Sequence, residues 1–154
     1  MDAALVRKIL DACYLAKRVT ETMPPLPAGL VPRHVHILDA VHRLGMHNEK
    51  VHVGDVSAGM NATTPSIARL IAELEKLGYL TKHAETADKR FVSLRLSEKG
   101  RDFHALYVEV FHEGLAAALE DLDDEDCRAA ITVMQTVHER IRTVTQNFTG
   151  KEKK

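Results

Sequence analysis

The sequence has only two cysteines, Cys13 and Cys127, no tryptophan and no long apolar run. Two cysteines cannot supply the several bridges of a small secreted scaffold, which indicates a reducing compartment. No stretch approaches the roughly 20 apolar residues of a membrane span, and the first residues carry charges where a signal peptide would be continuously apolar. A soluble, cytoplasmic protein without a membrane partner is expected.

The chain also has little excess of charge, with a net charge of −1 in 154 residues. Any surface for nucleic acid must therefore be local. Residues 101–127 hold one arginine against nine acidic residues, and such a block would repel phosphate, so it is expected to lie away from DNA. The acids at 123–126 also suit the start of a helix, where they face the positive end of its dipole.

Hydrophobic periodicity predicts mostly helical segments. A first amphipathic helix ends before the proline-rich loop at 23–27, and a second begins at Pro32 and stops near Gly45. A short third segment over 53–60 leads through a turn into a fourth helix, which closes at Gly78. The apolar residues of this fourth helix recur at i, i+3, i+4 and i+7: Ile67, Leu70, Ile71 and Leu74.

The period then changes from 3.6 to 2, because Val92, Leu94 and Leu96 alternate with polar residues. This alternation predicts a half-buried strand, with 79–83 as its antiparallel partner and 85–90 as the polar tip of the hairpin.

Two long helices are expected after the hairpin. Ser97 is a good N-cap for a helix with a broad apolar stripe from Phe103 to Leu122, and a last helix runs from about Asp124 with its apolar residues facing inward. The stripes are wider than one small lobe can cover. They are expected to form a dimer interface, although the pattern alone equally allows packing within one chain.

This order of elements, with the helix-turn-helix from Val53 to Leu80 and the hairpin exit Asp88–Gly100, resembles the MarR family of transcription regulators over nearly the whole length. The resemblance implies a mainly α (α+β) fold, a single domain over 1–154. Within it, 31–97 would form a winged helix-turn-helix lobe that binds DNA. Residues 1–22 and 98–148 would supply dimerisation helices.

The resemblance further implies a sequence-specific transcriptional regulator, a ligand-responsive repressor that binds an inverted-repeat operator in double-stranded DNA as a homodimer. A small aromatic effector would bind between the lobe and the dimer helices, in a pocket lined by the first, second and long fifth helices. No cofactor and no catalytic role are expected, because no nucleophile with a neighbouring base and no glycine-rich phosphate loop occurs. The competing hypothesis is a winged-helix protein-interaction module without DNA binding.

The fourth helix carries the expected major-groove residues on its outward face. Thr63, Thr64 and Ser66 can hydrogen-bond to phosphates or base edges, and Arg69 can fork onto a guanine. For the two threonines, helix capping is an equal alternative. Glu73 and Lys76, further along the helix, are interpreted as ordinary surface.

The hairpin tip carries the expected minor-groove residues. The negative potential of a narrow groove favours Arg90, and Asp88 can accept a hydrogen bond that fixes the direction of this arginine. A turn aspartate that bonds to its own backbone is the alternative. Lys89 and Lys82 would add phosphate contacts.

Nine histidines raise the question of a metal site. The five between 34 and 52 lack the i, i+3 or i+4 spacing of helical ligand pairs, so scattered surface histidines and no metal ligands are expected, with a metal-sensing regulator as the alternative. A thiol sensor is a second alternative. Cys13 lies beside Tyr14, but the following helix has no tyrosine to activate a thiol, which favours structural, half-buried roles for both cysteines.

Overall fold

The computed structural model describes residues 1–84 and 92–149, so the predicted wing-tip residues Asp88, Lys89 and Arg90 lie outside the described part. The chain divides into two compact units, one formed by Met1–Tyr14 with Leu115–Lys154 and the other by Leu15–Gly114. The predicted DNA-binding lobe falls inside the second. No helix within the described ranges is long and apolar enough to cross a membrane.

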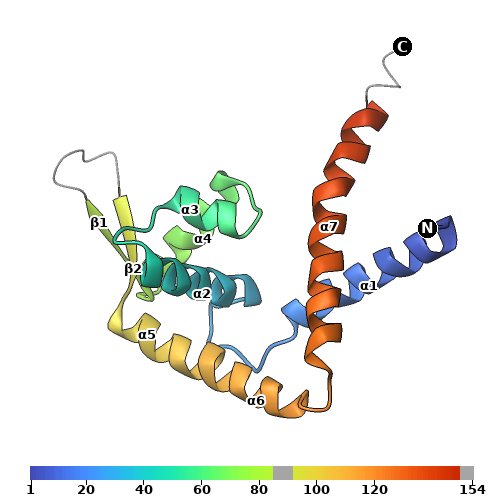
Figure 1. The fold of residues 1–154 in the computed structure, drawn as a ribbon. Helices are drawn as coiled ribbons and strands as arrows, with labels where there is room; N and C mark the ends of the chain where they lie inside the picture. The colour runs from blue at the N-terminus through green and yellow to red at the C-terminus, as the bar shows by residue number, and fades with distance from the viewer. Residues whose placement is uncertain (85–91, 150–154) are drawn as a thin grey trace. The chain divides into compact units, whose positions relative to one another are not determined.

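The second unit is built on three helices and a hairpin. Its elements are α2 (Pro32–His47), α3 (Val53–Gly59), α4 (Thr64–Lys76), β1 (Leu80–Ala84) and β2 (Val92–Leu96), and Figure 1 shows the hairpin beside the helices. The apolar residues predicted for α4 and most of those predicted for α2 are buried, each contributing ~1.5–3 kcal/mol: Ile37, Leu38, Val41, Ile67, Leu70, Ile71 and Leu74. Leu44, the last residue of the predicted α2 stripe, is only partly buried.

Helix α2 continues to His47, two residues beyond the predicted end at Gly45. A glycine ends a helix when it adopts a positive φ, and among the described glycines only Gly29 and Gly78 do so. Gly45 stays helical, and the last turn closes when the N–H of Asn48 donates to Leu44 O.

The turn and the end of α4 follow from local chemistry. Asn61, between α3 and α4, takes a left-handed φ of 49°, which asparagine tolerates better than most residues. Gly78 ends α4 with a φ of 80°. The N–H of Gly78 donates to Glu75 O at 3.0 Å and that of Tyr79 to Leu74 O at 2.9 Å, the two bonds of a Schellman motif. The predicted helix end is confirmed.

The predicted hairpin is also confirmed. Strands β1 and β2 pair antiparallel, with Leu80 opposite Leu96 and Ala84 opposite Val92. The expected alternation holds for Leu94 and Leu96 but fails at Ser93, which is buried although it lies between two apolar positions. Its hydroxyl donates to His83 O at 3.4 Å across the ladder, which satisfies the buried group.

The junction from β2 into α5 (Glu98–His104) ties the hairpin to the end of α4. Ser97 caps α5 as predicted, since its hydroxyl accepts from the N–H of Gly100 at 3.0 Å, and it also donates to Gly78 O at 2.6 Å. Lys99 Nζ donates to Leu77 O at 2.8 Å. Gly100 is buried so closely against Tyr79 that any Cβ there would collide with its carbonyl oxygen.

The long helix predicted after Ser97 is interrupted by a π-helical turn. Helix α5 continues into the π-helical turn η1 (Ala105–Val110) and then into α6 (Phe111–Ala118). Phe103 and Val108 are buried against the lobe, whereas Leu106 is 59% exposed and Val110 56% exposed. Only part of the predicted stripe is therefore covered within one chain.

The first unit combines the start of α1 (Ala3–Glu21) with α7 (Asp124–Thr149). The carboxylate of Asp123 accepts from the N–H groups of Glu125 and Asp126 at 2.8 and 3.1 Å, so acidic residues open this helix as predicted. The apolar residues of α7 that were predicted to face inward are largely exposed in a single chain: Ile131, Ile141 and Val144.

The two cysteines differ in their surroundings. Cys13 is half-buried, as predicted, and its Sγ lies 3.7 Å from Met134 Sδ. Cys127 is exposed, so the prediction of a half-buried thiol is wrong there. It lies in the first turn of α7, among acidic residues that remain in solvent.

Candidate DNA-binding interface

The first turn of α4 presents the three hydroxyl residues predicted to approach DNA. Thr63 occupies the N-cap position and is exposed, yet its side chain makes no capping hydrogen bond, so the alternative of plain capping does not describe this residue. Ser66 is half-buried one turn into the helix. Pro65 stands in the first turn, where its fixed φ suits the helix and its missing N–H costs nothing.

Thr64 has a partner that the sequence did not suggest. Its hydroxyl lies 3.1 Å from that of Ser57 on α3. Because the Ser57 hydroxyl donates to Gly54 O at 2.9 Å, Thr64 must donate to Ser57, and this ties α3 to the start of α4. Thr64 keeps lone pairs for a donor such as a base amino group, but its hydrogen is not available to a phosphate.

Arg69 projects from the same helix with 73% of its side chain exposed, which leaves it free to reach outward. Its Nη1 lies 3.7 Å from Glu73 Oε1, one turn further along α4. Surface pairs of this kind contribute ~0–1 kcal/mol, so the guanidinium can exchange Glu73 for a base edge at little cost.

Glu73 lies at the surface with 43% of its side chain exposed, and its carboxylate also has a buried partner that the sequence did not suggest. Its Oε2 lies 3.1 Å from Nε2 of His34, a residue of α2 that is 2% exposed. The N–H of Val31 donates to His34 Nδ1 at 3.2 Å, so Nε2 must carry the ring hydrogen and donate to Glu73. A chain of contacts thus runs from the backbone at Val31 through His34 to Glu73 and holds the carboxylate beside Arg69.

On the wing, Lys82 is the predicted DNA-contacting residue that the structure describes. Lys82 on β1 lies with its Nζ 2.6 Å from Glu75 Oε2, and this pairing competes with the phosphate contact expected of it. Asp88, Lys89 and Arg90 lie outside the described residues, and their roles stay predictions.

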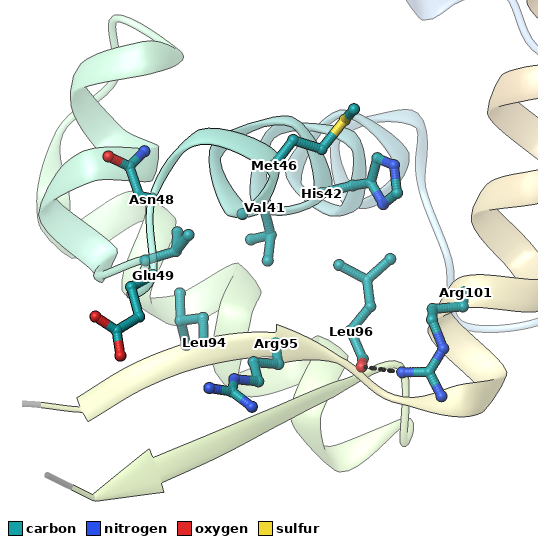
Figure 2. A pocket seen from close by; sticks show the side chains of 11 residues that line it. Val41, His42, Met46, Asn48, Glu49, Leu94, Arg95, Leu96 and Arg101 are labelled. Atoms are coloured by element: carbon teal, nitrogen blue, oxygen red, sulfur yellow. Dashed lines mark hydrogen bonds between the residues drawn. The ribbon is translucent and has the colours of Figure 1, made fainter.

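A pocket of about 450 Å³ opens between α2 and the hairpin (Figure 2). Val41, Leu94 and Leu96 supply apolar walls, and His42, Arg95 and Arg101 supply polar groups. Arg101 is held in place because its Nη1 donates to Leu96 O at 3.1 Å. The volume falls within the ~300–1,000 Å³ of small-molecule sites.

The prediction that the histidines are scattered on the surface is wrong for two of them. His34 and His104 are buried, with 2% and 4% exposure. His104 packs its ring on that of His42, with the ring centroids 4.1 Å apart. Three potential metal-ligand atoms lie within 4.8 Å of one another, on His42, His104 and Glu109. The spacing of residues along a single helix could not predict this group, because its members come from two segments of the chain.

A sequence model of the winged helix DNA-binding domain matches residues 30–100, which include α2, α3, α4 and the hairpin. No curated protein matches the chain.

Solved structures extend the similarity beyond the lobe. FabT of Streptococcus pneumoniae, crystallised in complex with DNA, is 18% identical, with 93% of this chain and 99% of that one covered at a TM-score of 0.64. PcaV of Streptomyces coelicolor, in complex with its natural ligand, is 18% identical, with 90% of this chain and 96% of that one covered at a TM-score of 0.63.

A MarR/EmrR family regulator from Acinetobacter sp. ADP1 is 14% identical, with 91% of this chain and 94% of that one covered at a TM-score of 0.62. At such identities the likeness is one of fold. It extends over the terminal helices as well as over the winged helix-turn-helix.

Proposed function

We propose that the chain is a winged-helix regulator that represses transcription by binding an inverted-repeat operator in DNA as a homodimer. Its residues 30–100 match the winged helix DNA-binding domain, and it shares the fold of a solved MarR/EmrR family regulator. The observation that carries the proposal is the outward face of α4. Small hydroxyl side chains lie at the start of the helix, and Arg69 is exposed beside a carboxylate that is hydrogen-bonded to the buried His34. Small residues let a helix lie deep in the major groove, and arginine is the commonest specific reader of guanine.

Dimerisation is supported by apolar surface in the first unit. Leu5, Val6 and Leu10 on α1 are 42–48% exposed. A groove of about 490 Å³ runs between α1 and α7, and its walls are mainly apolar, with Val6, Leu10, Val133, Ile141 and Val144 among them. Continuous apolar surface of this kind marks an interface, and a second copy of the chain is the occupant that a two-fold operator requires.

Sedimentation and footprinting of the full chain test the two halves of this proposal together. At micromolar concentration we expect a species of twice 17.2 kDa, and on the DNA upstream of its own gene a footprint with two half-sites about one helical turn apart. Ile141→Asp, in the apolar groove, should weaken the dimer at least about tenfold, because it places a charge in a desolvated interface. Gln135→Asp, an exposed polar position of α7, is the matched control. A monomer that protects a single half-site would overturn the proposal.

The pocket of the second unit supports a small aromatic acid as the effector. The predicted effector pocket had walls from the first, second and long fifth helices, whereas this pocket joins α2 and α5 with β2 and takes no residue from α1. Its apolar walls suit a ring, and the guanidinium groups of Arg95 and Arg101 suit a carboxylate. Such a ligand lowers DNA affinity only if it binds the DNA-incompetent state more tightly.

Phenolic acids at millimolar concentration are therefore expected to raise the melting temperature and to lower operator affinity at least about fivefold. Arg95→Ala should reduce both responses, because Arg95 is an exposed charge at the pocket. Arg33→Ala removes the same charged group from an exposed position in the first turn of α2, outside the pocket, and serves as the control. Unchanged melting and unchanged affinity would rule out this class of effector.

A further inference from the structure

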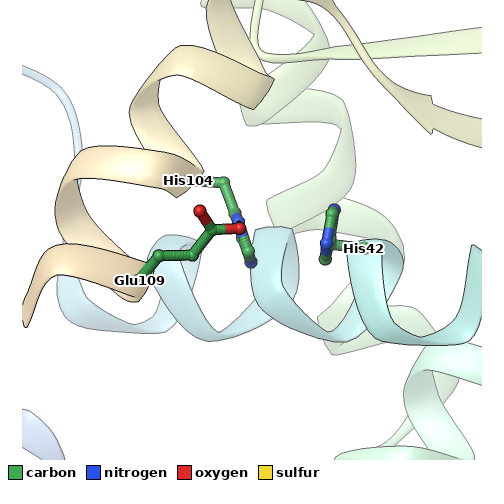
Figure 3. A group of neighbouring side chains, drawn as sticks. All are labelled: His42, His104 and Glu109. Carbon is green, nitrogen blue, oxygen red and sulfur yellow. The ribbon is translucent and has the colours of Figure 1, made fainter. Parts of the chain in front are cut away.

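We propose that His42, His104 and Glu109 form a binding site for a divalent transition-metal ion of the zinc class, which joins α2 to the π-helical turn η1. Figure 3 shows the three side chains converging, with the imidazole of His42 facing that of His104 and the carboxylate of Glu109 beside it. Their candidate ligand atoms all lie within 4.8 Å of one another. Zinc–nitrogen and zinc–oxygen bonds are about 2.0–2.2 Å long, so small side-chain shifts would place all three on one ion.

His104 is already oriented for this role. Its Nε2 lies 3.3 Å from Asp39 Oδ1, and its Nδ1 lies 3.4 Å from Glu109 Oε1. If Nε2 donates its hydrogen to Asp39, the lone pair of Nδ1 faces a carboxylate oxygen, and a cation between these two acceptors removes their repulsion. Histidine ligands of metals commonly donate their second ring N–H to a carboxylate in this way.

Asp39 is itself held in position, as the outer partner of a metal ligand should be. Its Oδ2 accepts from Arg43 Nε at 2.9 Å, one turn further along α2. The two oxygens of Asp39 are thus divided between Arg43 and His104, and the imidazole has little freedom to rotate. His104 is 4% exposed, which adds to this constraint.

The π-helical turn explains how Glu109 reaches the site. In an α-helix the side chains of residues i and i+5 diverge by about 140°, so His104 and Glu109 would point in different directions. The wider turn over Ala105–Val110 brings residue i+5 back toward residue i. No proline or glycine occurs in this turn to account for the distortion, and π-helical turns are frequent at functional sites.

The ligand set selects the class of metal. Two imidazoles and one carboxylate suit zinc and its transition-metal neighbours, whereas calcium and magnesium prefer oxygen ligands alone. Three protein ligands leave a fourth position for water or another small donor. His42 also lines the pocket of the second unit, so this position is reached from solvent.

The test is a zinc titration of the full, untagged chain in competition with a chromophoric chelator, repeated with cobalt to record its visible spectrum. We expect one ion per chain and the cobalt bands of a four-coordinate site. Glu109→Gln preserves the shape of a 56% exposed side chain, so folding is kept, and it should weaken metal binding at least about tenfold. Asp39→Asn should weaken it about 10–100-fold, because it alters the partner that orients His104. His138→Gln, an exposed histidine of α7, should change nothing.

Three results would overturn the proposal. If Glu109→Gln and wild type bind zinc equally well, or His138→Gln loses as much affinity as Glu109→Gln, the ion binds to surface histidines elsewhere. A wild-type chain that takes up no ion in competition with the chelator would show that the three side chains do not form a metal site. Because the readout is metal binding alone, failure here leaves the proposed DNA binding untouched.

Discussion

Gly100→Ala is expected to destabilise the protein by about 3 kcal/mol, because the added methyl group has no space to enter. A Cβ at this position would collide with the carbonyl oxygen of Tyr79, which is backbone and cannot rotate away as a side chain would. The same oxygen accepts from the N–H of Ser97 at 3.1 Å, and Ser97 in turn caps α5. Relief of the clash must therefore move α5 away from the base of the hairpin.

Thermal unfolding checks this expectation, since about 3 kcal/mol corresponds to a drop in melting temperature of roughly 6–12 °C in a domain of this size. Gly45→Ala is the matched control. It adds the same methyl group within α2 where no atom lies within 4 Å, and should stabilise by about 0.5–1 kcal/mol. Equal melting of wild type and Gly100→Ala would show that the close approach at Tyr79 is not maintained in solution.

The parts of the fold that sequence predicted are those governed by near neighbours along the chain. The spacing of Ile67, Leu70, Ile71 and Leu74 predicted α4 because helical periodicity depends only on intervals, and all four residues are buried. Gly78 predicted the end of that helix because a positive φ is a property of one residue. Ser97 is a similar local signal.

The features that sequence missed depend on pairs far apart in the chain. His34 and Glu73 are separated by 39 positions, and no interval rule joins them. A sequence signal did exist for Arg69 and Glu73, whose i, i+4 spacing favours an ion pair on a helix. His42 and His104 come from different helices, and Glu109 meets them through a π-helical turn that hydrophobic periodicity does not detect.

The candidate interface shows the same division. The outward face of α4 was predictable, because burial of one stripe determines which residues remain outside. The hydrogen-bond and ion-pair partners of those residues could not be predicted. These partners determine how available each side chain is for contact with DNA. Thr64 donates to Ser57, whereas Arg69 stays 73% exposed. Among the predicted contacts in the described residues, Arg69 carries the strongest expectation.

Arg69→Ala is expected to reduce operator affinity by about 1–3 kcal/mol for each half-site, and so by about 2–6 kcal/mol for a dimer on a complete operator. Affinity falls because alanine cannot donate the two hydrogen bonds that the arginine makes to a guanine, and water at the base edge does not restore them. Preference should relax at one position of each half-site. Folding should change by less than about 0.5 kcal/mol, because the side chain is 73% exposed and its contact with Glu73 is a weak surface pair.

Titration of labelled operator and of operator changed at single base pairs, at two salt concentrations, measures both affinity and preference. Lys76→Ala is the matched control, since it removes the same charge from an exposed position of the same helix, and it should weaken all sequences by a similar small factor. Arg90→Ala should weaken binding with less change in major-groove preference. It should also flatten the salt dependence by about 0.9 for each phosphate that the variant no longer neutralises. If Arg69→Ala and Arg90→Ala both fold, dimerise and bind the operator as wild type does, neither α4 nor the hairpin tip holds DNA as proposed.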